Sequence, residues 1–302
     1  MWHSKAMPEL PEVAGLRAFL DAKLRGTVLA KVQITSFAVL KTADPPYAVL
    51  EGRTVDGVRR FGKFLCLDLD GVHFVFHLAK AGWLRFTEDP SPAPLRPGAG
   101  PIAARLAFSA RRTESSDGGG FLMGFDLTEA GSKKSLAVYV VRDPQEVAGI
   151  ASLGPDPLAP EFTREVFDGI LSAAQQIKGL LRSQSVVAGI GNAYSDEILH
   201  AARISPFAIA KTLDGDSRDR LFAAIGGILG QAVESAVGKA PGELKDSKRT
   251  TMRVHGRTGQ QCPVCGDTVR EVSFADTALQ YCPGCQTNGK ILADRRTSRF
   301  LK

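Results

Sequence analysis

Long apolar runs are missing from this sequence. No stretch reaches the roughly 18 apolar residues that a membrane-spanning helix needs, and the residues from Met1 to Ala6 lack the apolar core of a signal peptide. No segment repeats at a period of about 20 to 50 residues, which excludes a repeat array. We therefore expect a cytoplasmic protein without a membrane partner.

Cysteine is also scarce, with five residues in 302, and Cys66 stands alone in an apolar stretch. The other four form two pairs with two residues inside each, Cys262/Cys265 and Cys282/Cys285. In a cytosolic chain this spacing favours one zinc ion over disulfides, and unligated thiols are the alternative. Four thiolates leave no open position, so we expect structural rather than catalytic Zn²⁺.

Acidic residues are outnumbered, 32 against 38 basic, for a net charge of +6 and a pI near 9.1. From Thr163 to Lys302 the counts are 14 and 19, so most of the excess lies there. A basic surface favours a polyanionic partner such as nucleic acid, although a solvated basic surface is the common alternative.

The apolar pattern changes along the chain. Residues 11–24 have the spacing of an amphipathic helix, and residues 28–141 hold short Val/Phe/Leu-rich segments between Gly/Pro clusters, typical of a β-sandwich or barrel. Three prolines in residues 154–160 suggest a linker, and helical periodicity follows. We expect a polar basic loop over 238–257.

The predicted class is α+β, with an N-terminal β-sandwich and flanking helices, then a helical domain and a metal-binding β-hairpin. The predicted divisions are a leader or misassigned start (1–6), the sandwich (7–153), the linker (154–160), the helical domain (161–254), and the zinc hairpin with its tail (255–302).

The run Met7-Pro8-Glu9 has two interpretations. Pro and Glu suit the first turn of a helix. If the chain instead starts at Met7 and that Met is removed, Pro8 carries a free secondary amine, which is a nucleophile, and Glu9 beside it can transfer protons. We interpret residues 1–6 as a leader or misassigned start.

A third signal is Gly189-Ile190-Gly191-Asn192, where the glycines allow a close turn and Asn192 is a good N-cap for the helix that follows. Free N–H groups at such a helix start suit a phosphate, although most capped helices bind nothing.

Together PELPEV, VRRFGKFLCLDL, KGLLRSQSVVAGIGNAYSDEILHAARISP and the CPVC and CPGC pairs resemble the formamidopyrimidine-DNA glycosylase/endonuclease VIII family, from Met7 to the end of the chain. The resemblance implies a helix-two-turn-helix domain, a zinc finger and a monomeric base-excision-repair enzyme in the cytoplasm, associated with the nucleoid. The implied partner is double-stranded DNA with damaged bases or abasic sites.

The same resemblance implies individual roles. Pro8 would attack C1′ of the damaged nucleotide, release the base and form an iminium, and elimination (β, often followed by δ) would then cut the strand. Glu9 would be the general acid/base. Lys63 would contact phosphate beside the lesion, although from pattern alone it could be a solvated hairpin cation. Gly191 and Asn192 would bind phosphates.

The sequence departs from the family pattern at three places. Lys80 stands where purine-directed members have a void-filling methionine, the segment 126–131 stands where an Arg and a Phe from a loop would lie, and Thr277 replaces an arginine of the zinc hairpin. Lys80 and Arg257 are expected to contact DNA, and Arg257 could compensate for the last change. These departures favour oxidised pyrimidines or abasic sites over 8-oxoguanine.

Two alternatives stay open. The first is a non-catalytic binder of damaged or abasic DNA on the same fold. The second is a zinc-ribbon nucleic-acid module joined to an unrelated β-domain, which explains the charge and the cysteines but not PELPEV or GIGNAY.

Overall fold

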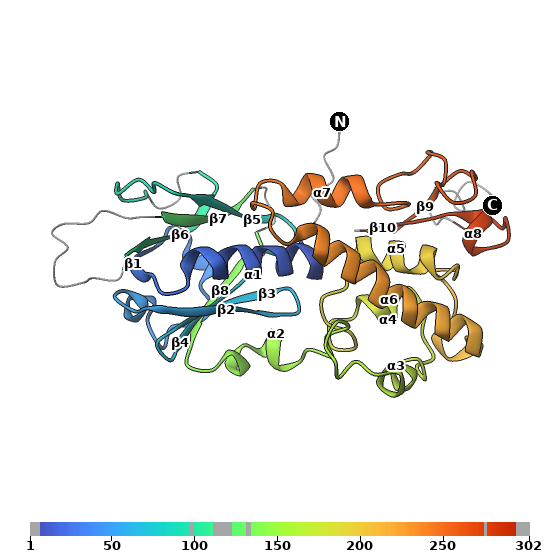
Figure 1. Ribbon diagram of the computed structural model, residues 1–302, viewed down its shortest axis with the longest axis horizontal. Helices are drawn as coiled ribbons and strands as arrows, with labels where there is room; N and C mark the ends of the chain where they lie inside the picture. The colour runs from blue at the N-terminus through green and yellow to red at the C-terminus, as the bar shows by residue number, and fades with distance from the viewer. Residues whose placement is uncertain (1–6, 97–99, 111–122, 131–133, 275–276, 294–302) are drawn as a thin grey trace. The chain divides into compact units, whose positions relative to one another are not determined.

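The computed structural model describes residues 7–96, 100–110, 123–130, 134–274 and 277–293 (Figure 1). The chain divides into two compact units. The first comprises Met1–Ser152 with Ala236–Lys245, and the second comprises Leu153–Ser235 with Asp246–Lys302. Both units draw on two separate stretches of sequence. The boundaries suggested by the sequence, at 154, 161 and 255, stay predictions.

The first unit is built around two four-stranded antiparallel sheets. One sheet has the order β1-β6-β7-β5 and the other β2-β3-β4-β8. The strands are β1 (Val28–Ile34), β2 (Val55–Phe61), β3 (Phe64–Leu69), β4 (Val72–His77), β5 (Gly82–Thr87), β6 (Ile102–Ser109), β7 (Met123–Glu129) and β8 (Ala137–Val141). The predicted α+β class with an N-terminal sandwich is confirmed.

Helix α1 (Leu10–Leu24) packs against the two sheets, and Figure 1 shows it in blue beside them. Its buried residues include Leu16, Leu20 and Leu24, which join one apolar core with Phe74 of β4 and Phe108 of β6. Because all five side chains have no exposed surface, the helix and both sheets share a single core. The short elements η1 (Phe37–Val39), η2 (Tyr47–Leu50), η3 (Pro144–Glu146) and α2 (Ala148–Ala151) complete the unit.

The second unit is helical, with a two-stranded hairpin near its end. Its elements are α3 (Arg164–Ile170), α4 (Ile177–Arg182), α5 (Asn192–Ala201), η4 (Ala210–Thr212), α6 (Gly215–Ala236), α7 (Leu244–Thr251), β9 (Arg270–Ser273), β10 (Ala278–Tyr281) and α8 (Pro283–Gln286). The end of α6 and the start of α7 fall in the stretch that belongs to the first unit. The apolar core of the second unit includes Phe167, Leu180, Ile190, Leu199 and Ile225.

Helix α7 lies inside the segment that we expected to be a loop, so that expectation is wrong for Leu244–Thr251. The segment is polar overall, yet Leu244, Lys248 and Met252 are all buried. These three residues recur every four positions, which is one face of a helix. A lysine occupies the middle of that face, so the apolar periodicity that signals a helix is absent. No helix of the described residues is long and apolar enough to cross a membrane.

The turn between β4 and β5 requires glycine at position 82. The backbone N–H of Gly82 donates to the carbonyl of Leu78 at 2.9 Å, and a Cβ built on Gly82 would lie 2.1 Å from that oxygen. By contrast, a Cβ built on Gly226 within α6 meets nothing within 4 Å. The two positions therefore differ in steric room.

We predict opposite effects of alanine at these two glycines. Gly82→Ala should lower the free energy of unfolding by about 1–3 kcal/mol through overpacking, and Gly226→Ala should raise it by up to about 1 kcal/mol through helix propensity. Urea titration followed by circular dichroism measures both. Equal effects of the two substitutions would contradict the packing argument.

Candidate functional site

The residues predicted to react lie at the start of α1. Pro8 is buried, and Glu9, which is 3% exposed, is the N-cap residue of the helix. The backbone N–H of Glu9 donates to Oε2 of Glu12 at 2.8 Å, and the Glu9 side chain accepts the N–H of Glu12 in return. This capping box holds the Glu9 carboxylate at the positive end of the helix dipole.

Lys63 lies in the two-residue turn that joins β2 to β3, and it is 8% exposed. Asp21 of α1 accepts the N–H of Val58, and Arg25 donates to the carbonyl of Asp56, so α1 and β2 run antiparallel. From Asp21 back to Glu9 the helix spans about 18 Å, and from Val58 on to Lys63 the strand spans about 16 Å. The turn between β2 and β3 therefore lies at the same end of this helix–strand pair as the start of α1 (Figure 1).

His77 of β4 is partly buried close to the positive charge of Lys63. Burial, and secondly the positive charge of Lys63, lower the pKa of His77 to about 4. The ring is therefore neutral at pH 7, and Nδ1 accepts the backbone N–H of Ala79 at 3.2 Å. The ring also lies 4.7 Å from the ring of Phe64, its partner in the β3–β4 register. This packing of His77 against Phe64 lies next to the β2–β3 turn that holds Lys63.

Lys80 is exposed on the turn between β4 and β5. The preceding residue, Ala79, has a φ of 53°, a left-handed conformation that alanine rarely adopts. The turn is closed by the Gly82–Leu78 hydrogen bond described above. Lys80 is thus presented to solvent from a constrained backbone.

The segment that we compared with an aromatic-bearing loop is largely a strand. Residues up to Glu129 belong to β7, and Asp126 forms an ion pair with Arg105 of β6 at 2.6 Å. The departure from the family pattern at residues 126–129 therefore falls within a strand, as the β-rich sequence of this region predicted. Ala130 follows the strand and remains described, while residues 131–133 lie outside the described ranges.

The start of α5 differs from the prediction by one residue. Gly191 is the N-cap residue, and Asn192 is the first residue of the helix. The side-chain Nδ2 of Asn192 donates to the carbonyl of Ala278 in β10 at 2.7 Å. This hydrogen bond links the β9–β10 hairpin to α5. Its Oδ1 is buried without a hydrogen-bond partner among the described residues. The prediction that Asn192 is the N-cap residue of this helix is therefore wrong.

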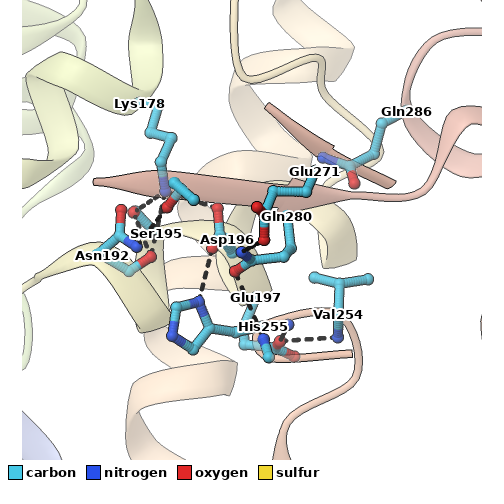
Figure 2. Close-up of polar contacts among 12 residues, drawn as sticks. Lys178, Asn192, Ser195, Asp196, Glu197, Val254, His255, Glu271, Gln280 and Gln286 are labelled. Carbon is cyan, nitrogen blue, oxygen red and sulfur yellow. Dashed lines mark hydrogen bonds and ion pairs between the residues drawn. The ribbon is translucent and has the colours of Figure 1, made fainter. Parts of the chain in front are cut away.

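A buried ion pair that sequence analysis missed lies beside this helix start (Figure 2). Nζ of Lys178 in α4 donates to Oδ1 of Asp196 at 2.6 Å, to Oγ of Ser195 at 2.7 Å and to the carbonyl of Asn192 at 3.1 Å. Oδ2 of Asp196 lies 2.8 Å from Nδ1 of His255. Lys178 and Asp196 are almost fully buried, so the pair is shielded from solvent.

The neighbouring acid, Glu197, organises the chain after α7. Its carboxylate accepts the backbone N–H groups of Arg253, Val254 and His255 at 2.8–2.9 Å. Burial raises the pKa of Glu197, and the three N–H donors act against that rise. The sequence did carry a signal, since three consecutive polar residues stand at positions 195–197, but it named no partners.

Arg257 follows the same segment. Its Nε donates to the carbonyl of Met252, and its Nη1 donates to Oε1 of Gln260 at 3.2 Å. The guanidinium is half-buried and bonded to its own loop. These contacts give Arg257 a structural role, because they hold the loop that precedes Cys262.

The four paired cysteines come together as predicted. Sγ of Cys262 lies 3.8 Å from Sγ of Cys285, and Sγ of Cys265 lies 3.2 Å from Sγ of Cys282. Tetrahedral zinc with Zn–S bonds near 2.3 Å separates two sulfurs by about 3.8 Å, which the Cys262–Cys285 distance matches, whereas the Cys265–Cys282 distance is shorter. Burial raises the pKa of Cys282 to about 11, whereas the backbone N–H of Asp267 lowers that of Cys265.

A histidine joins this cluster, and sequence analysis missed it. Nε2 of His200 in α5 lies 3.3 Å from Sγ of Cys262. Donor atoms of His200, Cys262, Cys282 and Cys285 all lie within 4.8 Å of one another, so this group could hold a metal ion. The only hint in the sequence was its position four residues after Asp196, on the same helix face.

Two family models match the chain. The formamidopyrimidine-DNA glycosylase N-terminal domain matches residues 7–116, and the formamidopyrimidine-DNA glycosylase H2TH domain matches residues 153–240. The formamidopyrimidine-DNA glycosylase of Symbiobacterium thermophilum is 33% identical over 303 residues, which cover 96% of this chain and 93% of that protein. An uncharacterized formamidopyrimidine-DNA glycosylase-like protein of Mycobacterium tuberculosis is 55% identical over 152 residues, which cover 50% of this chain and 95% of that protein.

Solved structures agree with these matches. The MutM (Fpg) protein of Thermus thermophilus is 31% identical, with a TM-score of 0.74 and coverage of 92% of this chain and 98% of that one. A Lactococcus lactis Fpg mutant in complex with Fapy-dG-containing DNA is 25% identical, with a TM-score of 0.78 and coverage of 93% and 100%. The chain therefore belongs to the formamidopyrimidine-DNA glycosylase family, and the predicted resemblance is confirmed.

We predict that the Lys178–Asp196 pair is essential for stability. Asp196→Ala should cost about 3–5 kcal/mol, because it leaves a buried lysine without its counter-charge. Asp168→Ala is the matched control. Asp168 pairs with Arg164 at 2.8 Å, but both side chains are 36% exposed, so the loss should stay below about 1 kcal/mol. Thermal and urea unfolding of both variants measure the difference, and similar losses would refute the assigned role.

Proposed function

We propose that this chain is a DNA glycosylase with abasic-site lyase activity that removes oxidised bases and cuts the strand through the amine of Pro8. The observation that carries the proposal is the start of α1, where Pro8 and Glu9 are buried side by side and the turn with Lys63 lies at the same end of the helix. Membership of the formamidopyrimidine-DNA glycosylase family supports it.

The proposed chemistry requires Pro8 to be the first residue, with Met7 removed. The nitrogen lone pair of Pro8 attacks C1′, and the damaged base departs with the glycosidic electron pair and takes up a proton. Opening of the sugar then gives an iminium, which is always cationic because the amine is secondary. This cation acidifies the C2′ proton, and its removal expels the 3′ phosphate. Hydrolysis of the iminium returns the amine.

Glu9 and Lys63 have supporting roles in this scheme. Glu9, held by the capping box, gives a proton to the sugar oxygen as the ring opens and takes protons in later steps. Lys63, on its two-residue turn, attracts the phosphate beside the lesion. Gly191 and Asn192 at the start of α5 provide N–H groups for a further phosphate, and Arg257 adds positive charge on the loop that precedes the cysteines.

The four cysteines are proposed to hold one Zn²⁺ ion. Four thiolates leave no position for substrate, so the ion would provide structural stability only, by folding the turns that flank β9 and β10. Asn192 and Ala278 connect this hairpin to α5 through the hydrogen bond described above.

The preferred substrates are proposed to be oxidised pyrimidines or abasic sites in double-stranded DNA, ahead of 8-oxoguanine. The exposed cationic Lys80, on its constrained turn, supports this preference, because a lysine is a poor apolar filler for the space of a flipped base. The protein would act as a monomer in the cytoplasm, associated with the nucleoid. The second candidate function is non-catalytic binding of damaged or abasic DNA, which applies if Pro8 remains an internal amide.

Borohydride trapping on an abasic duplex tests the chemistry. A protein shown by intact mass to begin at Pro8 should give a covalent adduct, and Pro8→Gly or an uncleaved leader should reduce it to below about 1% of that level. Pro11→Ala is the matched control, since Pro11 is an internal amide in the same helix and its loss should leave the adduct.

Failure of the chain beginning at Pro8 to form any adduct would exclude the lyase. Tight, lesion-selective DNA binding without an adduct would then favour the non-catalytic binder. Equal binding of undamaged and abasic DNA would favour the zinc-ribbon module.

A panel of single-lesion duplexes tests substrate preference. We expect faster cleavage of oxidised pyrimidines and abasic sites than of 8-oxoguanine. Lys80→Met should shift the ratio toward 8-oxoguanine by about tenfold, which corresponds to about 1.4 kcal/mol. Lys134→Met is the control, because it removes an exposed lysine elsewhere in the same unit and should leave the ratio unchanged. A wild-type preference for 8-oxoguanine would contradict the proposed specificity.

A further inference from the structure

The metal cluster offers more donors than one tetrahedral ion can use. Four thiols, from Cys262, Cys265, Cys282 and Cys285, already supply a full set. His200 adds a fifth donor, with Nε2 at 3.3 Å from Sγ of Cys262. In a tetrahedral site with one nitrogen and three sulfurs, a nitrogen and a sulfur lie about 3.5 Å apart. The position of Nε2 thus fits a ligand of the same ion.

His200 is buried and points into the cluster. Its side chain is 2% exposed, and it comes from α5, 62 residues before Cys262 in the sequence. Nδ1 has no hydrogen-bond partner among the described residues, so Nε2 makes the one polar contact recorded for the ring there. A histidine in such a place is either a donor to a thiolate or a ligand that can replace one.

The four cysteines are not equivalent. Cys262 and Cys282 are buried and Cys285 is partly buried, whereas Cys265 is exposed. The donor atoms that all lie within 4.8 Å of one another belong to His200, Cys262, Cys282 and Cys285, a set that leaves out Cys265. The three least exposed thiols and the histidine therefore form a complete set of four donors.

We propose that His200 is an alternative fourth ligand, so that the zinc ion can be held either by four cysteines or by His200 with Cys262, Cys282 and Cys285. In the exchange the Zn–S bond to Cys265 breaks and its thiolate takes up a proton or is modified. The lone pair on Nε2 forms the new Zn–N bond. Both sets are known types of structural zinc site.

This exchange would protect the site from loss of the exposed thiol. An exposed thiolate is the one open to oxidation or alkylation. Without a substitute for it, the ion would be left with three ligands and would dissociate more readily. Because His200 belongs to α5, the histidine-bound form would tie the ion directly to the helix that begins at Asn192. The inference rests on the proposed structural zinc ion and is independent of the glycosylase chemistry.

Metal content and coordination of full-length variants test the inference. Wild type should bind one equivalent of zinc. Cys265→Ala should still bind one, with an affinity within about tenfold of wild type in a chelator competition. Cobalt-substituted Cys265→Ala should show three thiolates and one nitrogen in its absorption spectrum, where wild type shows four thiolates.

His200 is tested in both backgrounds. His200→Phe alone should keep one zinc ion, because four cysteines remain. His200→Phe combined with Cys265→Ala should lower affinity at least about a thousandfold below Cys265→Ala alone. His200→Gln in the same background separates the roles, since an amide can donate an N–H to sulfur but is a poor zinc ligand. Cys282→Ala is the control for a thiol without a substitute and should lose the ion, and circular dichroism checks folding.

Three results would overturn the inference: loss of zinc from Cys265→Ala equal to that from Cys282→Ala, no effect of His200→Phe in the Cys265→Ala background, or full rescue by His200→Gln. Absence of zinc from wild type would instead refute the zinc proposal itself, and with it the inference, while the borohydride result would stand on its own.

Discussion

Two adjacent acids of α5 hold the second unit together. Asp196 neutralises the buried amine of Lys178 and contacts His255, while Glu197 accepts three consecutive backbone N–H groups from residues 253–255. Charges this deeply buried are tolerated only when every one of them is paired or hydrogen-bonded. The segment that they anchor (Figure 2) leads toward Cys262, so the same two side chains help to position the cysteine cluster that could hold a metal ion.

The first unit meets a different constraint at the start of α1. A helix N-terminus leaves backbone N–H groups without partners, and here Glu9 and Glu12 satisfy them reciprocally. The same arrangement fixes the carboxylate next to Pro8. Residues that serve helix formation are thus the residues that the proposed chemistry uses, which is why the sequence alone supported both interpretations of Pro8-Glu9.

Several features were predictable from local sequence. The strands follow from β-rich segments between Gly/Pro clusters, and the cysteine cluster follows from two pairs at the spacing of a zinc site. Others were not. Helix α7 has a buried lysine on its inner face, and Asn192 bonds to a hairpin 86 residues away rather than capping its helix. In each case a distant partner overrides the local preference.

The sequence by itself determined the class of fold, the family motifs, and the residue types able to react or bind metal, because these depend on periodicity, composition and short spacings. Tertiary structure decided which of them meet. Lys63 comes to the same end of its unit as the start of α1 only through the packing of α1 against β2. The pairs Lys178–Asp196 and His200–Cys262 are 18 and 62 residues apart in the chain, and they meet only when the core closes. Burial then gives these pairs their strength, because it removes the water that would otherwise screen or replace each contact.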